Sequence, residues 1–146
     1  MKTMFKLGAI LFSVCFVCST FAKGPIVGKW KTIDDETNEP KSIVEIFERD
    51  GKFYGKIIEL FLKADADQHP TCDKCDDDDP RKDQPSLGME IIKDMQPNKD
   101  AYSWGKILDP KNGKEYKCKI TREGDTLKMK ASILFLYRTQ TWHLVK

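Results

Sequence analysis

The chain has 146 residues, and its 25 basic and 23 acidic residues give a formal net charge of +2. Residues 1–22 hold two of the lysines and none of the acids, so residues 23–146 carry 23 of each sign. A near-neutral chain lacks the basic surface that binding to nucleic acid requires, so we expect no nucleic-acid partner. Residues 23–146 suffice for one domain with a core, but not for two.

The first 22 residues have the features of a secretory signal. Lys2 and Lys6 precede an apolar stretch at residues 7–17, and small residues flank Phe21 in Thr20-Phe21-Ala22. The apolar stretch is too short to span a bilayer comfortably. We expect cleavage after Ala22, export to the periplasm or the extracellular space, and no membrane span in the mature chain.

The remaining chain reads as a series of short strands joined mostly by turns. Asp50-Gly51 separates two of them and is a strong signal for a tight hairpin, because both residue types adopt positive φ readily. A long irregular segment is expected from about residue 61 to residue 86. The expected strands are residues 26–33, 42–49, 52–60, 87–94, 101–109, 114–121, 126–132 and 138–145.

Alternation is clearest late in the chain. Tyr116, Cys118 and Ile120 share one face of their strand, and Lys117 and Lys119 share the other. Apolar residues alternating with lysines indicate half-buried antiparallel strands. Eight such strands favour an all-β, antiparallel up-and-down barrel with one long cysteine-containing loop, because closure removes exposed sheet edges. An open sandwich is the alternative.

Gly28-Lys29-Trp30 opens the first strand. A Gly-x-Trp in this position resembles the opening motif of lipocalins and fatty-acid-binding proteins, in which the tryptophan plugs one end of the barrel and a basic residue packs across it. A guanidinium can stack on an indole face. The resemblance implies that Trp30 is buried at one barrel end with Arg138, from the last strand, against it.

Several further segments resemble one family of exported bacterial proteins, the domain of unknown function 2147 (DUF2147). The resemblance extends nearly end to end over residues 23–146, which we take as a single domain. It implies a lipocalin-like barrel and no established activity. The matching pieces are "GKWKT", "SIVEIFERDGKFYGKIIEL", "CDKC", "PSLGMEII", "WGKILDPKNGKEYKCKI", "LKMKASI" and "RTQTW".

Three cysteines follow the predicted signal. Cys72 and Cys75 are close enough for a local disulfide, which an oxidising compartment favours. The alternative is a metal site formed by Cys72, Cys75 and His69, which Cys118 could complete. We predict the disulfide and no metal or cofactor, with Cys118 a free, buried and inert thiol.

Four acids, Asp76 to Asp79, follow the second of these cysteines. They could bind calcium, but they lack the spaced ligands and central glycine of a calcium loop. Adjacent acids more often form a solvated loop. We therefore expect this segment to face solvent and to leave the Cys72–Cys75 pair accessible to oxidants.

Large side chains at alternating positions could line or fill the barrel. On the last strand, Arg138 and Gln140 share a face with Trp142, and they either orient the polar head of a ligand or satisfy backbone groups and cap Trp30. Met129, also inward, could help to fill the interior. The candidate ligand-binding residues are Trp30, Tyr54, Trp104, Tyr116, Arg138, Gln140 and Trp142.

Two functions follow from these features. The first is binding of a small, mainly apolar molecule in the barrel. The second is a structural or interaction role for a barrel with a filled core, acting through its loops. We expect no enzyme activity, because the mature chain has only His69 and His143 as histidines and contains neither a nucleophile elbow nor a phosphate-binding glycine loop.

Overall fold

The computed structural model describes residues 25–146, so the predicted signal segment, residues 1–22, lies outside the described residues. The described chain contains eight strands, and their positions are close to those predicted from the sequence. None of its residues is helical. The strands are β1 (Gly28–Ile33), β2 (Pro40–Arg49), β3 (Lys52–Leu60), β4 (Glu90–Asn98), β5 (Ala101–Asp109), β6 (Lys114–Glu123), β7 (Thr126–Ile133) and β8 (Leu136–Leu144).

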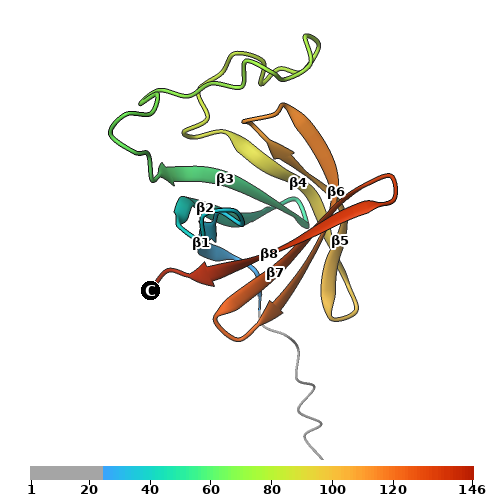
Figure 1. Cartoon of the computed structure of the whole chain (residues 1–146). Coiled ribbons are helices and arrows are strands. Elements are labelled where there is room, and N and C mark those ends of the chain that lie inside the picture. Colours follow the sequence, from blue (N-terminus) through green and yellow to red (C-terminus); the bar gives the residue numbers. More distant parts are fainter. Residues whose placement is uncertain (1–24) are drawn as a thin grey trace, which may run out of the picture.

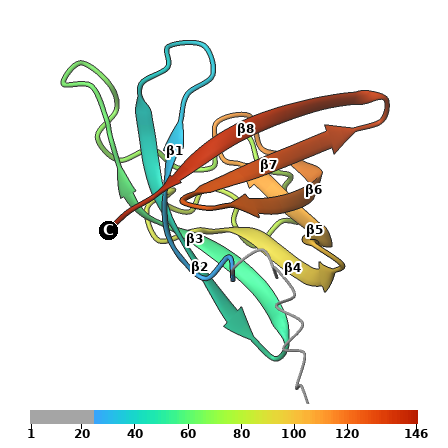
Figure 2. The ribbon, with the colours of Figure 1, turned by 90° about the horizontal axis from the view of Figure 1, so that it is seen from below.

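The strands form a closed barrel in sequence order, with every neighbour antiparallel (Figures 1 and 2). The predicted up-and-down barrel is therefore confirmed, and the sandwich alternative is wrong. The seam between β1 and β8 is short. It contains only the residue pairs Trp30–Leu144 and Lys31–His143. As a result, most of β8 extends beyond β1, and the β7–β8 hairpin projects from the barrel (Figure 2).

Turn chemistry explains the strand connections. The β2–β3 turn has φ of 53° at Asp50 and 74° at Gly51, the left-handed conformation that Asp-Gly was predicted to supply. In an up-and-down barrel, alternate connections lie at the same end. The β2–β3, β4–β5 and β6–β7 turns therefore lie at one end with the start of β1 and the end of β8, here named the closed end. The β1–β2, β3–β4, β5–β6 and β7–β8 connections lie at the other, here named the open end.

The closed end is filled by large side chains. Trp30 is fully buried there, and its indole N–H donates to the Ile26 carbonyl at 2.8 Å. The interior is so tightly packed that two glycines could not become alanine without displacing neighbours. A Cβ at Gly105 would lie 2.3 Å from Met95 Sδ, and one at Gly55 would lie 2.9 Å from Ile92 Cδ1. The other large, fully buried side chains of the interior include Trp142, Ile46, Ile92, Met95, Ile120, Leu127 and Met129.

The guanidinium over Trp30 comes from Arg122, not from Arg138 as predicted. Arg122 Cζ lies 5.3 Å from the indole centroid, and its guanidinium also donates to the Pro25 carbonyl. The prediction was wrong because the seam register pairs Trp30 with Leu144. Arg138 is six residues away on β8, about 20 Å along an extended strand.

No helix among residues 25–146 is long and apolar enough to cross a membrane.

We predict that Trp30→Ala lowers the free energy of unfolding by about 3–5 kcal/mol, because it leaves a large cavity and removes the indole hydrogen bond. Urea denaturation measures this loss. Trp104→Ala is the matched control, since 66% of that tryptophan is exposed, and we expect it to cost about 0.5 kcal/mol or less. Equal losses in the two variants would contradict the assignment of Trp30 to the closed end.

Candidate functional site

The inner surface of the barrel at the open end is only partly covered. Directly paired residues share a face of a sheet, so the strand register identifies the inward side chains. Thr32 and Ser42 are buried and linked by their hydroxyls at 2.8 Å. The others are half-buried or exposed and mostly apolar: Leu60, Ile107, Tyr116, Ala131, Ile133, Leu136, Arg138 and Gln140. The packed core thus gives way to an open mouth.

Polar side chains link β8 to the β1–β2 connection at this mouth. Arg138 donates to Asp35, and Gln140 Nε2 donates to the same carboxylate oxygen at 3.1 Å. Trp142 Nε1 donates in turn to Gln140 Oε1 at 3.2 Å. Arg138, Gln140 and Trp142 thus share one face, as predicted, but the first two bind Asp35 and do not cap Trp30. This row bridges the gap where β8 has no β1 partner.

Two of the seven candidate ligand residues were wrongly expected to face the lumen. Trp104 is 66% exposed, because β5 carries a bulge between Tyr102 and Gly105 that reverses the alternation. Tyr54 lies on the outer face of β3, where its hydroxyl donates to Asp94 at 3.1 Å. Neither side chain can contact a molecule held inside the barrel.

The other five candidates lie at different depths. Trp30 and Trp142 are buried in the packed interior. Tyr116, Arg138 and Gln140 reach the mouth, where they are half-buried or exposed. Only these three of the predicted residues are placed to contact a molecule that enters from the open end.

The Cys72–Cys75 disulfide is present, and Cys118 is a free, buried thiol, both as predicted. The bond uses both sulfurs that the alternative metal site with His69 would need. Residues 25–146 contain no cluster of potential metal ligands. Burial also raises the pKa of the Cys118 thiol well above its usual value, and its Sγ contacts the Met129 sulfur inside the barrel.

The disulfide is not accessible in the way that the acidic sequence suggested. Cys72 is completely buried and Cys75 is 3% exposed, because residues 70–86 fold back and pack on the barrel. The contact with the β5–β6 turn is close. A Cβ at Gly113, whose φ is 71°, would lie 1.8 Å from the Lys74 carbonyl oxygen, so only glycine fits. The long connection is therefore part of the folded domain.

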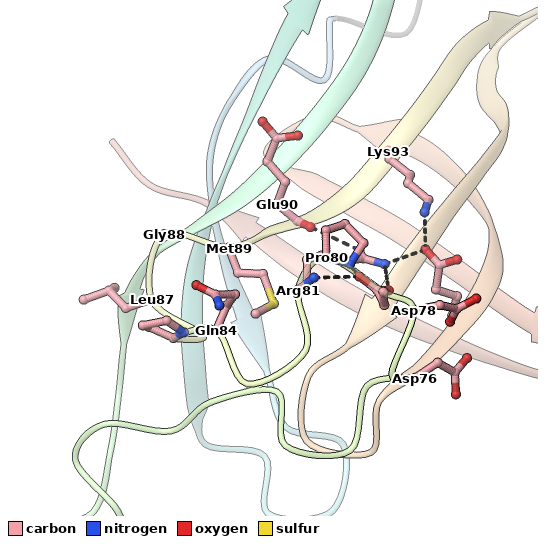
Figure 3. A pocket seen from close by; sticks show the side chains of 13 residues that line it. Asp76, Asp78, Pro80, Arg81, Gln84, Leu87, Gly88, Met89, Glu90 and Lys93 are labelled. Carbon is pink, nitrogen blue, oxygen red and sulfur yellow. Dashed lines mark hydrogen bonds and ion pairs between the residues drawn. The ribbon is translucent and has the colours of Figure 1, made fainter.

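Ion pairs hold the same segment to the outer wall of the barrel (Figure 3). Arg81 Nη2 lies 2.6 Å from Asp79 Oδ2 and 2.9 Å from Glu115 Oε2 on β6. Lys93 from β4 adds a 2.6 Å contact to Glu115, and Lys106 from β5 a 3.5 Å contact. The cluster connects the loop to three strands.

These ion pairs line a shallow groove of about 830 Å³ between the loop and the barrel. Side-chain hydrogen bonds from Arg81 lower the pKa of Asp79 to about 2, against the opposing effect of burial. Burial alone would raise the pKa of Glu115, but hydrogen bonds from Lys93 and Arg81 outweigh it and lower that pKa. The charges are paired with one another. These ion pairs, here named the loop clamp, hold the loop against the barrel.

Sequence reasoning missed four residues that organise these regions. The alternation through Tyr116, Cys118 and Ile120 continues to Arg122 and indicates that it faces inward, but not that it lies over Trp30. Asp35, Arg81 and Glu115 had no comparable local signal, since each acts on a partner that is distant in sequence.

Comparisons with known proteins agree with this architecture. Residues 28–144 match a family model described as an uncharacterised protein conserved in bacteria, DUF2147. Among solved structures, the chain is similar to protein HP1028 from Helicobacter pylori, which is described as a member of the lipocalin family. The TM-score is 0.69 at 22% sequence identity, and the alignment covers 84% of each chain. No curated protein matches the chain.

We predict that acid weakens the loop clamp. The folded pKa of Asp79, about 2, lies below its usual 3.8, so its ionised form stabilises the fold above pH 3.8 and this contribution is lost as pH falls towards 2. The full loss is on the order of 2 kcal/mol. Urea denaturation at pH 5 and at pH 2.5 measures most of this loss, which is complete only below pH 2. Arg81→Met should shrink the pH effect, whereas Arg49→Met, at an exposed pair with Glu90, should not.

We also predict that reducing the Cys72–Cys75 bond loosens residues 70–86 and leaves the barrel folded. A bond that closes so short a loop removes little unfolded-state entropy, well below the roughly 3 kcal/mol of a loop of about 15 residues. Amide hydrogen exchange with and without reductant would show faster exchange in the loop alone. Alkylation of unfolded, non-reduced protein at Cys72 or Cys75 would contradict the pairing, because in the native state both cysteines are buried.

Proposed function

Because the chain belongs to the DUF2147 family and folds as a lipocalin-like barrel, we propose that it binds one small amphipathic molecule at the open end, apolar over most of its length and anionic at its head. Barrels of this size can hold a single small ligand. Outside the cytoplasm, where the predicted signal would send the protein, such a molecule would need a carrier or a receptor. The disulfide is consistent with that compartment.

The proposal is carried by one observation: the inner face of the mouth carries a single guanidinium together with apolar side chains that are half-buried on β5 and β6 and exposed on the β7–β8 hairpin. Ile107 and Tyr116 come from β5 and β6, and Ile133 and Leu136 from the β7–β8 hairpin. Covering them removes apolar surface from water. Arg138 stands among them with a planar donor set that suits a carboxylate, sulfonate or phosphate.

The depth of the barrel limits the size of the ligand. Cys118 is 5% exposed and Met129 1% exposed, and both lie beneath the mouth. A ligand therefore occupies only the upper part of the barrel and does not reach Trp30. This favours a short chain or a single ring system over a long fatty acyl chain.

The Asp35 carboxylate occupies the position that the anionic head of a ligand would take, and a ligand could replace it there. The carboxylate accepts from Arg138 and Gln140, so it stands where the anionic head of a ligand would bind. An incoming anion would take over these donors and release Asp35 to solvent. Since the ion pair is more than half exposed on its arginine side, separating it costs little.

A second candidate function is a structural or interaction role for a barrel with a filled core. The tight packing around Gly55 and Gly105 favours it, because that half of the interior has no room even for a methyl group. In both proposals the protein binds and does not catalyse. They differ in whether the mouth or the outer loops make the contact.

The test is a titration with the fluorescent anionic amphiphile anilinonaphthalene sulfonate, combined with native mass spectrometry of protein purified from its own host. We expect saturable binding at one site, weakened about tenfold in Arg138→Gln, since a charge-assisted contact contributes about 1.4 kcal/mol or more. A retained small molecule in the mass spectrum would identify the natural ligand class.

Arg49→Gln is the matched control, because it removes an arginine from the outer face of the barrel. We expect it to bind the probe as the unmodified protein does. Equal loss of binding in both variants, or binding that does not saturate, would refute a site at the mouth and favour the filled-core function.

A further inference from the structure

The tip of the β7–β8 hairpin is the most apolar exposed surface of the described chain. Leu134 and Phe135 form the turn and are 93% and 98% exposed. Leu136 and Tyr137, which follow, are 75% and 68% exposed, and Ile133 before them is 40% exposed. Five consecutive large apolar residues in contact with water are costly, and such patches in native proteins mark binding surfaces.

The backbone of this tip adds to the cost. Leu134 has φ of 51°, a left-handed conformation that a branched side chain adopts unfavourably and that glycine or asparagine would adopt readily. The hairpin is supported on one side only: β7 pairs with β6 as far as Ser132, whereas β8 pairs with β1 only at residues 143–144. The tip is thus a protruding apolar arm that no other part of the described chain covers.

Lysines surround the base of this arm. The hairpin, residues 126–144, contains Lys128, Lys130 and Arg138 and not one aspartate or glutamate. On the outer face Lys130 lies directly opposite Lys119 of β6, an arrangement of like charges that destabilises a sheet. Lys130 Nζ also sits 4.1 Å from the ring centroid of Tyr137. Within residues 25–146, none of these lysines has a carboxylate partner within 4 Å.

We propose that the β7–β8 hairpin docks the protein on an anionic lipid bilayer, with Leu134 and Phe135 inserted among the acyl chains. Tyr137 would then lie at the level of the head groups, where aromatic side chains with a polar tip are favoured. Lys130 and its neighbour Lys119, which lie closer to the tip than Lys128 does, would meet the anionic head groups. One contact would remove all three costs: the exposed apolar tip, the unpaired lysines and the Lys119–Lys130 repulsion.

A bilayer fits this surface better than a second copy of the chain does. The tip is convex and narrow, whereas a symmetric dimer needs a self-complementary patch. Bringing two such hairpins together would also place the lysines of one copy beside those of the other. Apolar insertion combined with basic residues is the pair of signals that makes membrane association stable.

The inference does not depend on the proposed ligand. The hairpin nevertheless belongs to the open end, so a docked protein would hold its mouth close to the bilayer surface. A molecule leaving the membrane would then reach Arg138 over a short path.

Co-sedimentation of the folded chain, residues 23–146, with vesicles tests the proposal. We expect binding to vesicles of phosphatidylethanolamine and phosphatidylglycerol in a 3:1 ratio, and at least tenfold weaker binding to pure phosphatidylcholine. Leu134→Ser/Phe135→Ser should lower binding to the anionic vesicles at least tenfold. In the variant Lys119→Gln/Lys130→Gln, binding to the anionic vesicles should depend much less on salt concentration. Phe135→Trp should bind, and its fluorescence should be quenched by brominated acyl chains.

Leu87→Ser/Trp104→Ser is the matched control, because it removes two large exposed apolar side chains away from the hairpin, one in the β3–β4 connection and one on β5. We expect it to bind vesicles normally. The proposal is overturned if the control and the tip variant lose binding equally, or if the unmodified protein does not bind anionic vesicles. Gel filtration showing a dimer that only the tip variant dissociates, without vesicle binding, would assign the arm to self-association instead.

Discussion

Burial of the Trp30 indole at the closed end is the contact on which the rest of this barrel depends. The ring is completely buried, its N–H donates to the Ile26 carbonyl, and the Arg122 guanidinium lies over it. These contacts join residues 25–30 to β6. Without them the short β1–β8 seam, with only two residue pairs, would have little to hold it closed.

Because large side chains fill the closed end of the barrel, a ligand can enter only at the open end. Large side chains occupy the interior up to the level of Cys118 and Met129, and the inward side chains above that level are mostly half-buried or exposed. The side chains there are forced into partial contact with water, because β8 runs past the end of β1. Exposure at the mouth and on the hairpin arm thus has one geometric origin, the mismatch in length between the first and the last strand.

The long β3–β4 connection is held by interactions of a different kind. Its residues cannot enter the filled barrel, so they pack on the outside through a disulfide, a close backbone contact at Gly113 and the charges around Arg81. Packing a loop on the outer wall buries Leu108, which would otherwise face solvent. The acids that make this segment look solvated in the sequence include Asp79, one of the residues that anchors it.

Local patterns in the sequence determined the all-β class, the number of strands, the Asp50-Gly51 turn and the Cys72–Cys75 bond, since each depends on residues close together in the chain. The tertiary structure alone decided that Arg122 and not Arg138 covers Trp30, that a bulge turns Trp104 outward, and that the loop buries its disulfide. These outcomes depend on strand register and on packing between distant segments. A shift of one residue moves a side chain to the other face of a sheet, and no local pattern reports it.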